Sequence, residues 1–258
     1  MKYFNCLLFV LCIFISCGNN VFLDEYKLLY TDIENINTYG YKSYYNYEKK
    51  MAVFEINDGQ GAIVHTEIPT DCAIVGQGFF KVKLEDGFGY TRNGNFAINE
   101  YGELMLGYPR YSFYEPIFLP EYFLPETINI KRNGDIFVSV VRPRAELEEV
   151  YIGQLKIYEI PTNLLEYYQN GIYKLKSETN EEEILNDGYL IEHKFLEYSN
   201  VYRVAVLLRM YYILSNLNEK TISNIEFKKD MLKIMIEKMT ERNAYFIEDI
   251  VPFLRYDY

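Results

Sequence analysis

The sequence predicts an α+β protein in which paired N- and C-terminal coiled-coil helices flank an antiparallel β-rich domain. Three observations predict this class. An apolar stripe at helical spacing follows the first residues, strand and turn signals fill residues 44–195, and a second helical stripe begins near residue 204. The 258 residues are 49% hydrophobic and 24% charged, which is a globular composition. We therefore expect these segments, in order: a signal peptide over 1–16, a helical segment over 17–43, the β-rich domain over 44–195, a coiled-coil helix over 196–242 and a tail over 243–258.

The first seventeen residues have the parts of an export signal. Lys2 is followed by an apolar run from Cys6 to Ile15 and then by Ser16-Cys17-Gly18. The run is shorter than the ~20 apolar residues that a bilayer-spanning helix needs. Its end resembles a bacterial lipobox, which would make Cys17 the lipidated N-terminus; the alternative is an uncleaved anchor or a buried first helix. Cleavage would leave only Cys17 and Cys72 as thiols, so we expect no disulfide and a small buried side chain at Cys72.

The first predicted helix follows the leader. Its apolar residues recur in steps of four and three along one face, with acidic residues between them. The run that begins at Asn35 ends the helix, because Gly40 favours a left-handed stop. The residues on the stripe are Phe22, Tyr26, Leu29, Ile33 and Ile36.

The middle of the chain is predicted to be a series of antiparallel hairpins. Short runs of strand-forming residues alternate with X-Gly turns such as Asp86-Gly87, Asn93-Gly94 and Asn133-Gly134. Gly76-Gln77-Gly78 lacks the third glycine of a dinucleotide loop, and a strand pattern follows it. We therefore interpret it as a turn or bulge.

The last long segment carries a stripe at heptad-like steps from Val204 to Met239. No Pro or Gly occurs between Leu196 and Thr240, which favours a long coiled-coil seam. Leaving either apolar stripe exposed to water is unfavourable, because burying apolar surface stabilises by roughly 25 cal/mol per Å². The simplest solution is that the two ends of the chain pack on each other and on neighbouring subunits.

Several function classes are disfavoured. The net charge of −11 argues against nucleic-acid binding, which needs clustered Lys and Arg. The two histidines, His65 and His193, stand far apart without ligand-spaced partners, and no Gly-x-Ser-x-Gly or Cys–His arrangement is present. We expect no enzyme activity, no catalytic residue, no metal and no cofactor.

Several motifs, in order along residues 30–235, resemble the bacterial flagellar basal-body rod and hook protein family, closest to its distal-rod and proximal-rod members. An Asn-x-Asn-Thr-x-Gly-Tyr-Lys run ends the first helix, and a Leu-Glu-x-Ser-Asn-Val run opens the last one. Between them, 73–82, 90–96, 102–104 and 152–155 resemble family segments. The motif residues at the two ends are Asn35, Asn37, Thr38, Gly40, Tyr41, Lys42, Leu196, Glu197, Ser199, Asn200 and Val201.

The resemblance implies a structural, non-enzymatic subunit of the flagellar basal body that supports motility. Its partners would be further copies of itself and other axial proteins, joined through the terminal helices and the two end motifs. Its place would be periplasmic. Three features depart from the family: the apolar leader, altered residues in the last helix, and about twenty residues after Leu232. The alternative is a membrane-tethered periplasmic lipoprotein with a rod-like fold that binds or assists without polymerising.

Overall fold

The computed structural model describes residues 20–144, 146–177, 183–184 and 187–216, together with Lys229 and Lys233. The chain divides into two compact units. Unit 1 comprises residues 1–34, 44–54 and 202–258, and unit 2 comprises 35–43 and 55–201. Among the described residues, no helix is both long and apolar enough to cross a bilayer.

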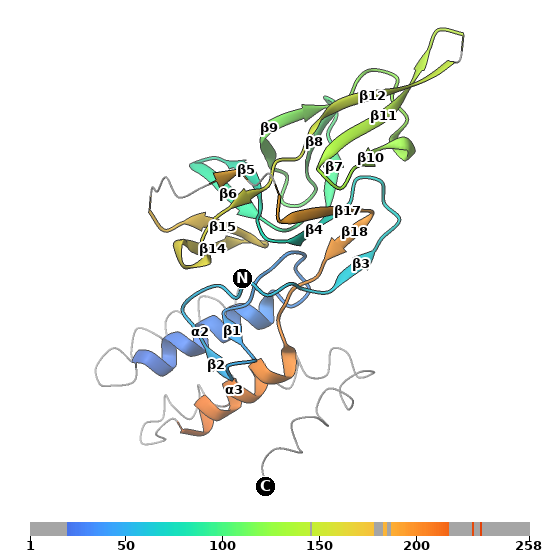
Figure 1. The fold of residues 1–258 in the computed structure, drawn as a ribbon. Helices are drawn as coiled ribbons and strands as arrows, with labels where there is room; N and C mark the ends of the chain where they lie inside the picture. Colours follow the sequence, from blue (N-terminus) through green and yellow to red (C-terminus); the bar gives the residue numbers. More distant parts are fainter. Residues whose placement is uncertain are drawn as a thin grey trace. The chain divides into compact units, whose positions relative to one another are not determined.

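A seven-stranded antiparallel sheet is the largest element of unit 2 (Figure 1). One hairpin of the sheet forms at a predicted X-Gly turn: Asp86-Gly87 joins β5 to β6, so that Phe80 pairs with Thr91 and Leu84 with Gly87. The predicted Asn93-Gly94 turn makes no hairpin, because β6 pairs with β5 and β15 whereas β7 pairs with β8. In spatial order the strands are β14 (Leu165–Gln169), β15 (Ile172–Leu175), β6 (Gly87–Thr91), β5 (Phe80–Leu84), β9 (Ser112–Phe118), β8 (Glu103–Leu106) and β7 (Phe96–Ile98).

The remaining strands of unit 2 form smaller antiparallel groups. A three-stranded sheet has the order β10 (Asn129–Ile130), β11 (Asp135–Arg142) and β12 (Glu146–Gln154). The strand pairs are β4 (Cys72–Gly76) with β17 (Tyr189–His193), β3 (Ile63–His65) with β18 (Phe195–Glu197), and β13 (Tyr158–Glu159) with β16 (Glu183–Ile184). Two short 3₁₀ helices, η1 (Pro125–Thr127) and η2 (Thr162–Leu164), lie in the connections.

One apolar core holds unit 2 together. Phe80, Phe96 and Phe113 meet edge to face, with ring centroids 4.8–6.4 Å apart. Buried aliphatic side chains such as Ile136 and Ile157 surround them. Cys72 is fully buried in this core, as predicted, and burial raises the pKa of its thiol.

Unit 1 contains two helices and a short hairpin. The elements are α2 (Asn20–Glu34), β1 (Tyr45–Asn46), β2 (Met51–Ala52) and α3 (Arg203–Asn216). The predicted stripe of α2 is buried at Tyr26, Leu29 and Ile33. The Asp32 carboxylate lies at the end of α2 and accepts hydrogen bonds from the backbone N–H groups of Tyr44 and Tyr45, at 2.8 and 2.9 Å. These bonds fix the start of the hairpin against α2.

The predicted fold class is wrong in its helical part. The described chain is mostly antiparallel β-strand, as expected, but it has two helices of 15 and 14 residues rather than a pair of long coiled-coil helices. The predicted helix over 196–242 does not begin at residue 196, because Leu196 and Glu197 belong to strand β18. The predicted stripe runs from Val204 through Leu208 and Tyr211, but Leu208 and Tyr211 are about half exposed. The buried residues Val206 and Met210 lie off this stripe, because α3 is apolar on more than one side. The leader, the tail and most of 217–242 lie outside the described residues.

Candidate functional site

The two end motifs meet at a buried carboxylate in unit 2. Glu197, in β18, is fully buried. Its Oε1 accepts hydrogen bonds from Lys42 Nζ at 2.5 Å and from the backbone N–H of Gly61 at 2.8 Å. Its Oε2 accepts from Arg92 Nε at 2.6 Å. The carboxylate of Glu197 therefore joins three segments that are distant in sequence. We call Lys42, Gly61, Arg92 and Glu197 the junction.

Lys42 supplies one of the two cations. Its ammonium is buried and also donates to the carbonyl of Gly59 at 2.8 Å. Burial lowers the pKa of Lys42 to about 8, and the neighbouring Arg92 acts in the same direction, although Glu197 opposes the shift. Burial is the larger cause, and the second cation adds to it, because two cations facing one carboxylate leave a net positive charge in a buried place. Lys42 is the cation that can release its proton, because a guanidinium does not.

Arg92 supplies the second cation and is nearly as buried as Lys42. Its guanidinium donates to two backbone carbonyls as well as to Glu197. The distances are 2.8 Å from Nη1 to Gly78 O and 2.7 Å from Nη2 to Ile74 O. Arg92 follows β6 directly, so it ties the main sheet and strand β4 to the junction.

Gly40 allows the closest approach of the N-terminal motif. Its backbone N–H donates to the carbonyl of Glu197 at 2.8 Å, and its φ of +67° lies in the left-handed region. A Cβ at this position would lie 2.3 Å from both Arg92 C and Asn93 N. Only glycine therefore fits between the two segments without moving backbone.

Asn200 fastens the C-terminal motif to two other segments. Its Oδ1 accepts from the backbone N–H of Ser43 at 2.6 Å, and its Nδ2 donates to the carbonyls of Asn57 and Gly59 at 3.0 and 2.8 Å. Its own backbone N–H donates to Tyr41 O at 3.2 Å. All the polar groups of this carboxamide are used within unit 2.

A cluster of tyrosines supports the N-terminal motif. Tyr41 is fully buried and packs against Tyr167 and Tyr173, with centroids 5.2 and 6.4 Å away. The Tyr173 hydroxyl accepts from the backbone N–H of Lys42 at 2.6 Å. The Tyr167 hydroxyl donates to Asn35 Oδ1 at 2.7 Å, and strands β14 and β15 hold both rings in place.

The structure brings together most of the predicted site residues. Asn35, Thr38, Gly40, Tyr41 and Lys42 come from the first motif, and Thr38 Oγ1 donates to Asn35 Oδ1 at 3.1 Å. From the second motif, Leu196 is buried in β18 and Ser199 Oγ accepts from Val201 N at 3.2 Å, beside Glu197 and Asn200. Asn37 is exposed, and Cys17 lies outside the described residues. Their part in assembly stays a prediction.

Arg92 and Tyr173 were not among the predicted site residues. Arg92 had a signal, since it is a lone basic residue between a strand and the Asn93-Gly94 turn of an acidic chain. Tyr173 had none, because nothing distinguishes it from the other 26 tyrosines.

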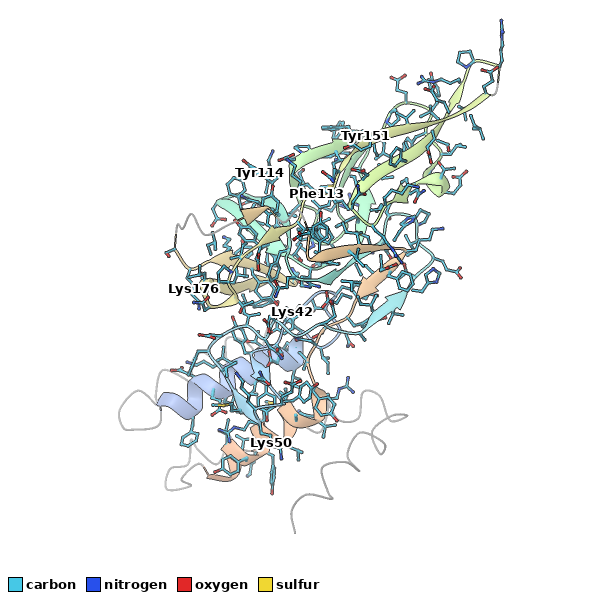
Figure 2. All side chains as sticks on the ribbon, in the orientation of Figure 1. Lys42, Lys50, Phe113, Tyr114, Tyr151 and Lys176 are labelled. Atoms are coloured by element: carbon cyan, nitrogen blue, oxygen red, sulfur yellow. The ribbon has the colours of Figure 1, made fainter. Side chains whose placement is uncertain are left out.

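The junction suits a structural role. Its carboxylate, ammonium and guanidinium, and the neighbouring carboxamide of Asn200, all bond to one another or to backbone groups. Among the described residues, no three His, Cys, Asp or Glu side chains are grouped as metal ligands would be. Figure 2 labels Lys42 of the junction. It also labels Phe113 and Tyr114, which line a separate pocket of about 20 Å³ together with Lys81, Glu115 and Lys156.

Comparison with known proteins connects this geometry to a family. Residues 73–138 match the D1 domain of the flagellar hook proteins FlgE, FlgF and FlgG. Flagellar basal-body rod protein FlgG of Buchnera aphidicola from Acyrthosiphon pisum is 36% identical over 110 residues, which are 40% of this chain and 38% of the relative. FlgG of Borreliella burgdorferi is 34% identical over 99 residues, or 38% and 36% of the two chains.

A longer match, with lower identity, is to the flagellar basal-body rod protein FlgF. FlgF of Buchnera aphidicola from Baizongia pistaciae is 27% identical over 179 residues, which are 62% of this chain and 68% of the relative. The chain spans less than two fifths of the length of the two FlgG relatives above. These matches confirm the resemblance inferred from the motifs.

Proposed function

We propose that this chain, which belongs to the flagellar rod and hook protein family, is a non-enzymatic structural subunit of the bacterial flagellar basal body. The observation that carries the proposal is the junction. Two motifs 155 residues apart converge on Glu197, inside the unit that contains the matched D1 segment. A site built only from mutually satisfied groups supports a building block rather than a catalyst.

The proposed partners are further copies of the chain and other axial proteins of the basal body. The end motifs would act in assembly by fixing the backbone of residues 35–43 and 196–201, since most of their polar groups bond within unit 2. Asn37, which is exposed, is the motif residue free to contact a neighbouring subunit.

The proposed place is the periplasmic part of the basal body, with Cys17 acylated and holding the chain to a membrane. The support is the lipobox-like end of the leader, Phe14-Ile15-Ser16-Cys17. Incorporation of labelled palmitate, lost in Cys17→Ala, tests this tether separately from the structural role.

Electron cryo-tomography of cells that lack the protein tests the structural role. We expect a missing or shortened rod and loss of motility, both restored by the wild-type gene. Glu197→Gln should restore less than Glu148→Gln, which changes an exposed ion pair in the same unit. An intact rod in motile deletion cells, or absence of the chain from purified basal bodies, would refute the proposal.

A further inference from the structure

Residues 45–54 of unit 1, which comprise strands β1 and β2 and the two residues after them, are called the hairpin; they expose three large side chains, of which Tyr47 also packs against Tyr202. Tyr47, Met51 and Phe54 are 43%, 48% and 62% exposed. Lys49 and Lys50 lie between them and are exposed as well, with Lys50 in a left-handed conformation at φ 49° (Figure 2). Three large apolar side chains around a pair of lysines resemble the surface of a peripheral membrane-binding element, with apolar groups for the acyl region and ammonium groups for phosphates.

The charge of the chain is distributed unevenly. Unit 2 contains 24 of the 37 acidic residues and 13 of the 26 basic residues, so it carries −11, and the charges elsewhere in the chain cancel. An anionic lipid surface would repel unit 2 but not unit 1. The hairpin itself has Lys49 and Lys50 against Glu48, a local excess of one positive charge.

The hairpin is also within reach of the proposed tether. Strands β1 and β2 pack against α2, and α2 begins three residues after Cys17. A helix of 15 residues is about 22 Å long, and two linking residues add about 7 Å at most. A chain acylated at Cys17 therefore holds the hairpin within about 30 Å of the bilayer surface.

From these three observations we propose that the β1–β2 hairpin inserts Tyr47, Met51 and Phe54 into the interface of an anionic bilayer, with Lys49 and Lys50 on the headgroups. This proposal rests on the tether at Cys17 proposed above, and it adds a second contact that orients unit 1 on the membrane. The occupant is a lipid surface rather than a second copy of the chain.

The absence of tryptophan allows a site-specific test. Full-length acylated Phe54→Trp carries a single tryptophan in the hairpin, and Tyr101→Trp carries one at a 78%-exposed position of unit 2 as a matched control. Each is reconstituted with vesicles of phosphatidylglycerol and phosphatidylcholine with brominated acyl chains. We expect quenching of the tryptophan at position 54 and none at position 101. Neutralising both lysines, in Lys49→Gln/Lys50→Gln, should weaken insertion about fivefold per lysine in anionic vesicles and leave it unchanged in phosphatidylcholine alone.

The outcomes separate the hairpin from the tether. Protein that floats with the vesicles while position 54 stays unquenched overturns the hairpin proposal and leaves the tether standing. Quenching at position 54 with excess vesicles, but without palmitate at Cys17, overturns the tether and supports the hairpin. A concentration-dependent blue shift at position 54 without quenching shows that a second copy covers the hairpin, which also overturns the proposal.

Discussion

Replacing Glu197 by Gln removes the negative charge that two buried cations share. The substitution keeps the shape of the side chain and an acceptor oxygen for Gly61 N–H, so the change is mainly electrostatic. Lys42 and Arg92 are then left in a buried site with neither of their ion pairs. Removing one partner from a buried ion pair typically costs 3–5 kcal/mol, and we expect about 4 kcal/mol here at pH 7.

Chemical denaturation measures this loss directly, because a domain of this kind has a total stability of about 5–15 kcal/mol. Glu148→Gln is the control, since its ion pair with Arg142 is about half exposed and should contribute less than about 1 kcal/mol. The loss in Glu197→Gln should shrink at pH 9–10, where Lys42 is neutral and only Arg92 is left unpaired. A loss at pH 7 no larger than that of Glu148→Gln would refute the reasoning.

Three further predictions concern single positions. Gly40→Ala should destabilise unit 2 by more than about 3 kcal/mol, because the new Cβ would lie 2.3 Å from backbone atoms. The control is Gly188→Ala, which has a similar φ but open space around it and should cost only about 1 kcal/mol. Thermal unfolding of both variants measures the difference. The folded chain binds a proton at Lys42 less tightly than the unfolded chain does, because the pKa of Lys42 is lowered to about 8 in the folded state. The unfolding free energy of wild type should therefore rise relative to that of Lys42→Met between pH 8 and 10.5, by up to about 3 kcal/mol. A difference between the two unfolding free energies that does not change over this pH range would contradict the prediction. Asp32→Ala should free the N–H groups of Tyr44 and Tyr45, lower stability by about 2–3 kcal/mol and speed their hydrogen exchange, while exchange at Tyr90 stays slow.

The β5–β6 hairpin was predictable because its signal is local. Asp86-Gly87 fixes the turn between β5 and β6, and alternation in Phe80–Leu84 fixes which face is buried. The order of strands in the sheet was not predictable, since β15 pairs with β6 across about 80 residues of chain. That pairing depends on core packing that no local pattern encodes.

For the helices, the sequence did not predict the packing partner. A stripe predicts that a helix buries one face but does not identify what covers it. The seam expected from Val204 onward assumed a long partner helix, whereas α2 is short and pairs with α3 partly through Glu25 and Arg209, which form two hydrogen bonds at 2.5 and 3.0 Å. The junction was partly predictable. Lys42 and Glu197 belong to the two predicted motifs, but the ion pair of Glu197 with Arg92 could not be predicted, because it depends on how the sheet places Arg92.

The position of Glu197 also sets the order in which the polypeptide can mature. Lys42 and Arg92 are synthesised long before Glu197, and neither cation has its carboxylate until the chain has grown past that residue. A product that stops early, or is cleaved before β18, keeps two cations without their counter-charge and leaves strand β3 without a neighbour. Unit 2 can therefore form these two ion pairs and the β3–β18 pairing only after synthesis has passed Glu197, and we expect shorter products to be cleaved faster by proteases.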